Sequence, residues 1–309
     1  MVYRMDQGRA SERLLTQRKG QKRQSERKGK IIVYTAATIT IVATLAVTFF
    51  LTQRGLQSFF VSGINPLEFF TSANWNPSGA DPSYGALAFI FGSLAVTLLS
   101  AIIVAPLGIG TAIFMTEIAP RWGKRILQPV IEILVGIPSV VYGYIGLTVL
   151  VPWIRDTFGG SGYSLVAGVV VVSVMILPTV TTLSADSLKS LPDGLRDSSY
   201  ALGATRWQTI RRVLLPAAIP GLLTAVILGM ARAIGEALAI QMVIGNTRII
   251  PDSLLDPAAT MTTIITLNMG HTTFGSAENN VLWTLGLLLM VMSYILVLTV
   301  RYLASRRKV

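Results

Sequence analysis

Long apolar runs alternate along this chain with shorter polar segments. An apolar helix needs ~20 residues to cross the hydrocarbon core of a bilayer. Six runs reach that length, at residues 31–51, 86–118, 126–152, 163–185, 217–245 and 281–303. Several are long enough to tilt, bend or protrude. The pattern therefore predicts an all-α integral membrane protein with six transmembrane helices.

The segment between the fourth and fifth runs, residues 191–216, is polar and basic. Its pattern predicts two short amphipathic helices, at about 194–202 and 205–214. Gly203 separates them and suits a sharp bend, because glycine adopts positive φ without steric cost. Thr205 is the expected N-cap of the second helix.

The two short helices each have an expected apolar face. It consists of Leu195, Ser199 and Leu202 on the first helix, and of Trp207, Ile210, Val213 and Leu214 on the second. Arg206, Arg211 and Arg212 lie on the other side. Such an element between two spans presents a surface to a soluble partner. The alternative is an amphipathic helix that lies on lipid headgroups.

The spacing of Gly203, nine residues, and then Val213, Leu214, Leu215 and Pro216 resembles the cytoplasmic coupling loop of bacterial ABC importer permeases. That loop opens with Glu-Ala-Ala in the family; here Asp197 keeps the acid, and two serines replace the alanines. The resemblance implies that the loop docks on an ATPase subunit. It assigns ATPase coupling to Leu195, Asp197, Tyr200, Ala201, Gly203, Ala204, Trp207, Ile210, Leu214, Leu215 and Pro216.

Composition agrees with a membrane protein, since 52% of residues are hydrophobic, 13% are charged and mean hydropathy is +0.61. Soluble domains do not have this composition. The expected organisation is a basic tail (1–30), an anchor helix (31–51) and an external loop (52–85). These are followed by a permease core with five transmembrane helices and the 191–216 coupling loop (86–303), and by a second basic tail (304–309).

Basic residues set the orientation, because Lys and Arg concentrate in cytoplasmic loops. They gather in residues 1–30, at Arg121, Lys124 and Arg125, at Lys189, Arg196, Arg206, Arg211 and Arg212, and at Arg301, Arg306, Arg307 and Lys308. The opposite loops hold only Arg54, Arg155 and Arg248, beside Glu68, Asp81, Asp156, Asp252, Asp256 and Glu278. Both termini are therefore predicted inside the cell, in a multi-pass protein of the cell membrane.

The basic N-terminal stretch has two interpretations, given the net charge of +11. We expect a solvated, partly disordered tail that fixes topology and touches anionic lipid. A nucleic-acid-binding arm is the alternative, but the tail explains the same residues more simply, so no nucleic-acid partner is expected. No cleavable signal peptide is evident, and the first span is expected to remain as an anchor.

The external loop, residues 52–85, mixes aromatic residues with turn-forming Asn, Pro and Gly. These aromatics either pack into a small cap or lie in the membrane interface. A site for an extracytoplasmic partner and simple anchoring both remain open. The motif Asn74-Trp-Asn-Pro77, followed by Tyr84-Gly85, resembles the phosphate-specific branch of the permease family, in its PstC-type subunit.

Arg232 and Glu236 are charged residues inside the fifth apolar run. Four residues apart on one helix, they are expected to share a face and to pair. The guanidinium fork suits an oxyanion, and Glu236 would hold it and keep anion binding weak enough for release. The segment resembles the Arg-Ala, hydrophobic residue, Gly-Glu signature of phosphate permeases, where both charges are functionally important. The alternative is an ion pair that only fixes helix packing.

The third run also carries polar groups. Gly136 and Pro138 permit a bend, and Ser139 and Tyr142 either line the pathway or satisfy backbone groups that the bend frees. Glu132 lies near the cytoplasmic end, as a gate or an anchor. Arg232, Glu236, Ser139, Tyr142 and Glu132 form the predicted substrate pathway. Glu117, at the end of the second run, is expected to be interfacial.

Enzymatic chemistry finds no support in the sequence. There is no cysteine, and His271 is a single histidine without a spaced partner, so no metal site is predicted. The phosphate-binding pattern Gly, four residues, Gly-Lys-Ser/Thr is absent, so ATP is expected to be hydrolysed on another chain. We expect no cofactor on this chain, and ATP with Mg²⁺ on the partner ATPase.

The resemblance implies the permease subunit of a phosphate ABC importer that works by alternating access. Its expected partners are a homologous second permease (PstA-type), two ATPase subunits (PstB-type), an extracytoplasmic phosphate-binding protein (PstS-type) and the lipid bilayer. Two alternatives remain open. One is a permease for another oxyanion such as sulfate or molybdate, and the other is a sensory or scaffold subunit that signals phosphate status.

Overall fold

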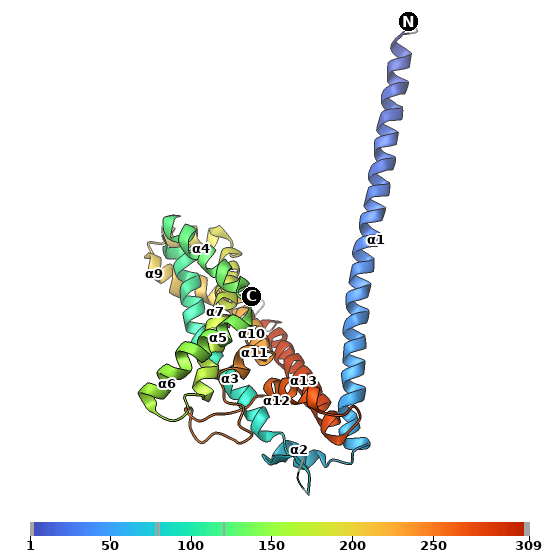
Figure 1. Cartoon of the computed structure of the whole chain (residues 1–309). Helices are drawn as coiled ribbons and strands as arrows, with labels where there is room; N and C mark the ends of the chain where they lie inside the picture. Colours follow the sequence, from blue (N-terminus) through green and yellow to red (C-terminus); the bar gives the residue numbers. More distant parts are fainter. Residues whose placement is uncertain (1–2, 78, 80, 120, 306–309) are drawn as a thin grey trace. The chain divides into compact units, whose positions relative to one another are not determined.

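The computed structural model describes residues 3–305 except 78, 80 and 120, and these form a predominantly helical protein (Figure 1). The chain divides into two compact units, Met1–Gln53 and Arg54–Val309. Five helices in the described part are long and apolar enough to cross a membrane, and a sixth span is counted if one sharply bent helix pair is a single crossing. The six predicted runs correspond to these segments. The predicted tail 304–309 lies largely outside the described residues.

Helix α1 (Tyr3–Phe60) makes up the first unit and ends inside the second. The sequence predicts a partly disordered tail over residues 1–30, whereas the helix already begins at Tyr3. No proline interrupts this stretch, and Lys, Arg, Glu and Gln, which favour helices, dominate it. The candidate span Gly29–Phe60 buries none of its most apolar window within this chain.

The external loop folds into a small cap, which consists of α2 (Pro66–Thr71), β1 (Trp75–Asn76) and β2 (Ser83–Tyr84). The two strands are antiparallel, with Trp75 opposite Tyr84. Trp75 is buried and its ring meets Phe89 edge-on, at 5.1 Å between centroids. Phe69 is fully buried in the same cluster. Of the two expected arrangements, Phe69 and Trp75 therefore adopt the packed one.

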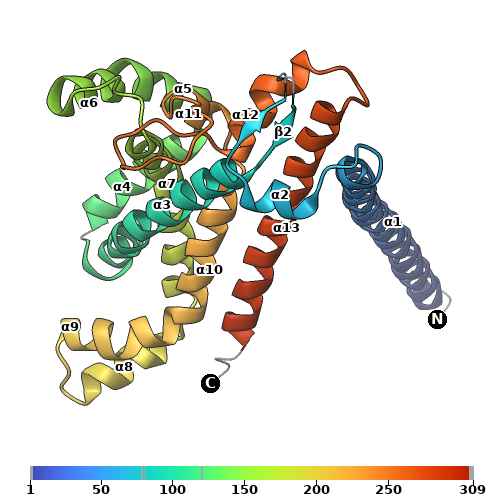
Figure 2. The same ribbon diagram turned by 90° about the horizontal axis from the view of Figure 1, so that it is seen from below.

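The second unit is built around long helices that pack against one another. They are α3 (Leu87–Ile113), which continues as the π turn η1 (Phe114–Ile118), α7 (Leu165–Lys189), α10 (Leu215–Ile234) and α13 (Ala277–Ser305). Helix α7 packs against both α3 and α10 (Figure 2). Val172, Met175 and Ile176 of α7 are buried in the main hydrophobic core. These contacts fix the frame on which the polar groups stand.

The third apolar run is not one straight helix. It forms α4 (Arg121–Gly136), α5 (Ser139–Ile145), the π turn η2 (Gly146–Leu150) and α6 (Val151–Phe158), with a bend of 95° after Gly136. Pro138 lacks an amide donor and disfavours helical backbone in the residue before it, so the helix stops there. Its two halves point in nearly perpendicular directions.

The fifth span is displaced from its predicted range of 217–245. Helix α9 (Arg206–Thr209) and the π turn η3 (Ile210–Leu214) run directly into α10, so one candidate span covers Arg206–Ile234. Pro216 lies at the start of α10, directly after the π turn η3, and Pro220 lies inside α10, so the span is helical throughout without being one regular α-helix. The helix ends at Ile234, eleven residues earlier than predicted.

A short irregular region follows the fifth span. It contains α11 (Leu238–Gln241), a long loop, α12 (Met261–Asn268) and the 3₁₀ turn η4 (Met269–His271). The loop packs on the start of α7, where the amides of Leu165 and Val166 donate to the carbonyls of Asp256 and Leu254, both at 2.9 Å. Free amides at a helix start need such acceptors. The loop is therefore held in place by hydrogen bonds.

Candidate functional site

The coupling loop forms two short helices, as predicted. Helix α8 (Asp193–Ala201) is followed by Gly203, whose φ of +78° provides the bend, and then by α9. Thr205 caps α9 in a capping box with Gln208. The buried hydroxyls of Ser199 and Thr209 lie 2.9 Å apart and tie the two helices together. Figure 2 shows α8 and α9 side by side at the end of α10.

The apolar residues of this loop separate into an exposed and a buried group. Leu202 is 89% exposed and Trp207 is 60% exposed. Ile210 and Leu214 are buried, because α8 packs against η3 and covers them. Trp207 therefore differs in burial from Ile210 and Leu214, with which it was expected to share an apolar face. Only the exposed group can contact another subunit.

The remaining predicted coupling residues have different degrees of exposure. Asp197, Tyr200, Ala201, Gly203 and Pro216 are exposed, whereas Leu195, Ala204 and Leu215 are half-buried. We define the exposed apolar side chains Tyr200, Leu202 and Trp207 as the docking face. Ile210 and Leu214 support this face from inside the chain.

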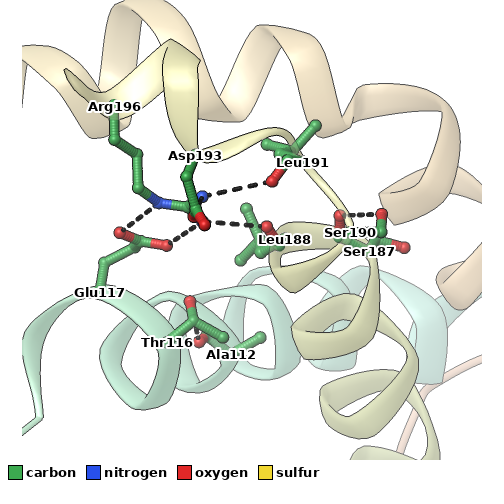
Figure 3. A network of polar contacts seen from close by, with 9 residues as sticks. All are labelled: Ala112, Thr116, Glu117, Ser187, Leu188, Ser190, Leu191, Asp193 and Arg196. Carbon is green, nitrogen blue, oxygen red and sulfur yellow. Dashed lines mark hydrogen bonds and ion pairs between the residues drawn. The ribbon is translucent and has the colours of Figure 1, made fainter. Parts of the chain in front are cut away.

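Arg196 anchors α8 to the rest of the protein (Figure 3). Its Nη2 lies 2.9 Å from Oε1 of Glu117 and also donates to the carbonyl oxygen of Leu188 at 3.1 Å. Its Nη1 donates to the carbonyl oxygen of Leu191 at 3.4 Å. The hydrogen bond to Glu117 raises the pKa of Arg196 above its ordinary value. A weaker contact reaches Asp193.

The pairing of Arg196 with Glu117 was missed from the sequence, where Glu117 was expected to be interfacial. The side chains are 18% and 9% exposed, so the pair is largely buried. The sequence signal for this pair is an acid at the end of the second span, together with a single arginine in the first coupling helix. The pair joins α8 to η1.

Arg232 and Glu236 are not paired. The ion pairs within 4.0 Å in the described part of the chain do not include them. Arg232 Nη1 instead donates to the hydroxyl of Thr179 on α7 at 3.0 Å. Glu236 Oε1 accepts from the amide of Ala239 at 3.1 Å. The prediction fails because α10 ends at Ile234, so the spacing of four does not span one helical turn.

The environment of Arg232 leaves its charge uncompensated. The side chain of Arg232 is exposed, and the hydroxyl of Thr179 that accepts its hydrogen bond is neutral. A guanidinium has five N–H donors, and one of them is used by the hydroxyl of Thr179. Among the described residues the other donors have no hydrogen-bond acceptor on this chain, so an anion could accept from them.

The polar groups of the third run lie in two places. Glu132 is exposed on α4, accepts from Gln128 Nε2 at 3.0 Å, and lines a cavity of about 70 Å³ with Thr181, Asp186 and Lys189. Arg232 does not line that cavity.

Tyr142 and Ser139 follow the bend. Tyr142 is buried, and its hydroxyl donates to the carbonyl of Leu134 at 2.8 Å. It therefore satisfies a carbonyl near the end of α4, which was one of the two expected roles for this hydroxyl. Ser139 is half-buried at the first turn of α5. Pathway lining by Ser139 stays a prediction.

Metal chemistry has no evident site here. Among the described residues, no group of three or more His, Cys, Asp and Glu side chains has an arrangement that suits a metal ion. The chemically distinctive features are therefore the docking face, the Arg196–Glu117 pair and the guanidinium of Arg232.

Comparisons with known proteins agree with this geometry. Residues 105–309 match the family model described as "Binding-protein-dependent transport system inner membrane component". The chain is 64% identical to the "Probable ABC transporter permease protein YqgH" of Bacillus subtilis, over 100% of both chains. It is 35% identical to the "Phosphate transport system permease protein PstC" of Mesorhizobium japonicum, over 77% of this chain and 78% of the relative.

The fold is also similar to solved structures. A bacterial ABC transporter that imports the acidic polysaccharide alginate contains a chain that matches with a TM-score of 0.63. The match covers 91% of this chain and 98% of that one, at 17% sequence identity. At this identity the likeness concerns the fold alone.

Proposed function

The chain belongs to the family of binding-protein-dependent transport system inner membrane components, and on that premise we propose that it is the permease subunit of an inorganic phosphate importer. In this ABC importer family the permease is the membrane component, and ATPase activity resides in separate subunits. The substrate arrives on a binding protein. The proposal adds the substrate, the partners and the residues involved.

Arg232 is the observation that carries the substrate proposal. A charge at membrane depth costs roughly 2.5 to 3.5 kcal/mol on an insertion scale, so its presence calls for a reason. Thr179 orients the guanidinium through a neutral hydroxyl, which leaves the positive charge free to attract an oxyanion. Relatives named as phosphate permeases support phosphate as that oxyanion.

The partners follow from the family and the docking face. We expect a homologous PstA-type permease, two PstB-type ATPases and a PstS-type phosphate-binding protein. The docking face of Tyr200, Leu202 and Trp207 would contact an ATPase in the cytoplasm, with both termini of this chain on the same side. Basic residues beside α8 and α9 favour that orientation.

Coupling would proceed by alternating access. ATP-driven closure of the ATPases would move α8 and α9, and the helical span from Arg206 to Ile234, which includes the π turn η3, would carry that movement to Arg232. Phosphate binds the guanidinium only weakly, because the site is open, and is released inward. Glu236 accepts from the amide of Ala239 in the first turn of α11, so its part would be to shape the backbone next to Arg232.

Uptake of labelled phosphate tests the proposal, in cells that lack this chain and are complemented with wild type, Arg232→Gln or Arg232→Lys. We expect uptake with wild type, loss with the glutamine variant and partial recovery with lysine. Arg155→Gln is the matched control, because Arg155 is an exposed arginine whose charge is paired with Asp156 at 3.1 Å.

Competing anions decide the substrate. An excess of sulfate or molybdate should leave phosphate uptake unchanged. Uptake that these anions suppress would favour a general oxyanion permease, and uptake that survives Arg232→Gln would remove Arg232 from the pathway. If loss of the chain leaves uptake intact but alters the phosphate response of the cell, the sensory alternative replaces the transport proposal.

A further inference from the structure

One side of α7 carries a row of polar residues. Their intervals of three or four positions place them on the same side of the helix, and they are Thr179, Thr182, Asp186 and Lys189. We define these four residues as the polar stripe. It begins at the hydroxyl that accepts from Arg232 and runs ~15 Å along the helix axis. The stripe therefore leads from the proposed phosphate contact to the end of α7.

A cavity of about 70 Å³ lies between the inner part of the polar stripe and α4. Thr182, Asp186 and Lys189 of α7 line it on one side. Gln128 and Glu132 of α4 line it on the other side. A space of this size holds only a few water molecules. A small movement of α4 would therefore bring the two sides into contact.

The charges on the two sides of this cavity are not paired with each other. Glu132 is exposed and accepts from Nε2 of Gln128, one turn away on its own helix, at 3.0 Å. Lys189 Nζ lies 3.7 Å from Oδ1 of Asp186, and both side chains are exposed. The ion pairs within 4.0 Å in the described part of the chain do not join Glu132 to Lys189. Such exposed contacts are weak, so they leave both charges able to pair across the cavity.

Helix α4 is attached in a way that suits such a movement. Most of its described side chains are exposed or half-buried, whereas Ile131 is buried. The helix ends at Gly136, where a Cβ would meet no atom within 4 Å, and a bend of 95° follows. Pro138 lacks an amide donor, so it cannot continue the helical hydrogen bonds across the bend. The bend is therefore a pivot about which α4 can approach α7.

The cavity also borders the anchor of the first coupling helix. Met115, which lines the cavity, lies two residues before Glu117 in η1. Lys189 directly follows Leu188, whose carbonyl accepts from Nη2 of Arg196 at 3.1 Å (Figure 3). A movement of α8 would therefore act on η1 and on the end of α7, and both elements border the cavity.

We propose that Glu132 and Lys189 form the inner gate of the pathway, and that they pair across the cavity when ATP binds the ATPases and separate when it leaves. This rests on the proposed function. Alternating access requires the inner end of the pathway to be closed whenever the outer end is open. The ion pair closes the inner end of the polar stripe by drawing α4 onto α7. In the separated state, which this structure shows, the cavity between the two helices is open.

Disulfide formation between positions 132 and 189 measures the closure directly. The chain has no cysteine, so Glu132→Cys/Lys189→Cys gives it a single pair of thiols, which can join only when their Cα atoms lie within about 7 Å. The full complex with its ATPases and binding protein is used, in lipid vesicles. We expect the disulfide to form several-fold faster with a non-hydrolysable ATP analogue than without nucleotide. Ser58→Cys/Thr284→Cys is the control, because these buried hydroxyls lie 2.7 Å apart and should crosslink equally in both states.

The ratio of phosphate imported to ATP hydrolysed tests the two charges themselves. Glu132→Gln and Lys189→Gln should each lower this ratio by up to about fivefold, the effect of losing an ion pair of about 1 kcal/mol. The double variant should lose no more than either single variant, because the second substitution finds no pair left to break. Arg125→Gln is the control and should match wild type, because Arg125 is an exposed charge on α4 that does not line the cavity.

Three results would overturn the gate. They are equal rates of disulfide formation with and without the nucleotide, additive losses in the double glutamine variant, and the same loss in Arg125→Gln. A wild-type complex that hydrolyses ATP without importing phosphate would overturn the proposed function instead. The nucleotide dependence of the disulfide needs no phosphate, so it would still decide whether Glu132 and Lys189 approach each other.

Discussion

Arg196 and Glu117 lie 79 positions apart in the sequence, and their side chains meet through two hydrogen bonds, of 2.9 and 3.4 Å. Exposed ion pairs contribute little to stability, but this one is largely shielded from solvent, and Arg196 also satisfies two backbone carbonyls. The first coupling helix is therefore attached firmly to the end of the second span. A movement imposed on α8 is passed to η1 as well as to α9.

Arg196→Met should destabilise the protein by about 3 kcal/mol, because it leaves the carboxylate of Glu117 without its partner. Thermal unfolding of the purified complex measures the change. Lys189→Met is the control, since Lys189 pairs with Asp186 in solvent and should contribute less than about 1 kcal/mol. Exchanging the two charges should not restore stability, because a glutamate at 196 cannot donate to the carbonyls of Leu188 and Leu191. Full recovery would contradict this account.

Gly203→Val should uncouple ATP hydrolysis from uptake while the complex still assembles. A Cβ here would meet no atom within 4 Å, so the cost comes from the positive φ, at about 1–2 kcal/mol. Asparagine tolerates this conformation, so Gly203→Asn should have a smaller effect. Gly194→Ala, in open space on α8 without positive φ, is the control. Equal activity of the valine and asparagine variants would exclude backbone conformation as the cause.

Trp207→Asp and Leu202→Asp should weaken the binding of the ATPase subunit, which affinity measurements on purified subunits can follow. Truncation of a central aromatic contact typically costs at least ~2 kcal/mol, or about thirtyfold in affinity. Leu254→Asp is the control, because Leu254 is similarly exposed but lies in the loop after the fifth span. Unchanged ATPase affinity in both docking-face variants would place the contact elsewhere.

Gly143→Ala should destabilise the contact between α5 and α11. The new Cβ would lie 2.9 Å from Cα of Ala239 and 2.9 Å from Sδ of Met242, so the backbone must move. Overpacking of this kind costs roughly 1–3 kcal/mol. Gly136→Ala has nothing within 4 Å and should be nearly neutral in the same unfolding experiment. A neutral Gly143→Ala would mean that α11 can shift freely.

Tyr142→Phe should lower stability by about 1–3 kcal/mol, because a carbonyl of α4 loses its donor. Hydrogen exchange around the bend should increase together with the loss of thermal stability. Tyr144→Phe alters an exposed tyrosine two residues away and should change neither quantity. Equal effects of both variants would assign the cost to something other than this hydrogen bond.

The sequence predicts the elements that depend on local chemistry. Apolar length locates the spans, Thr205 and Gln208 form the expected start of α9, and Gly203 takes the positive φ that a bend needs. Gly136 and Pro138 indicate a bend in the third run. Its size of 95° depends on packing partners distant in sequence, such as Gly143 against Ala239, and hydropathy does not contain that information.

The fifth span shows where hydropathy misleads. Residues after Ile234 remain apolar, so the run looks continuous although the helix stops at Gly235. For the same reason Arg232 and Glu236 look like a helical pair when they are not. The Arg196–Glu117 pair and the Arg232–Thr179 hydrogen bond join distant segments, and a single sequence gives residue types for such contacts without their partners.

The span from Arg206 to Ile234 is helical throughout, with the π turn η3 and Pro220 inside it, and it can act as a lever. Arg206 and Arg232 are ~39 Å apart along it, at 1.5 Å per residue. The packing of α10 on α3 and α7 serves as its fulcrum. A tilt of roughly 10° about the midpoint would swing the two arginines ~3 Å in opposite directions. A small stroke at the proposed docking end would thus displace Arg232, the proposed anion-binding residue, without a chain of side-chain rearrangements between them.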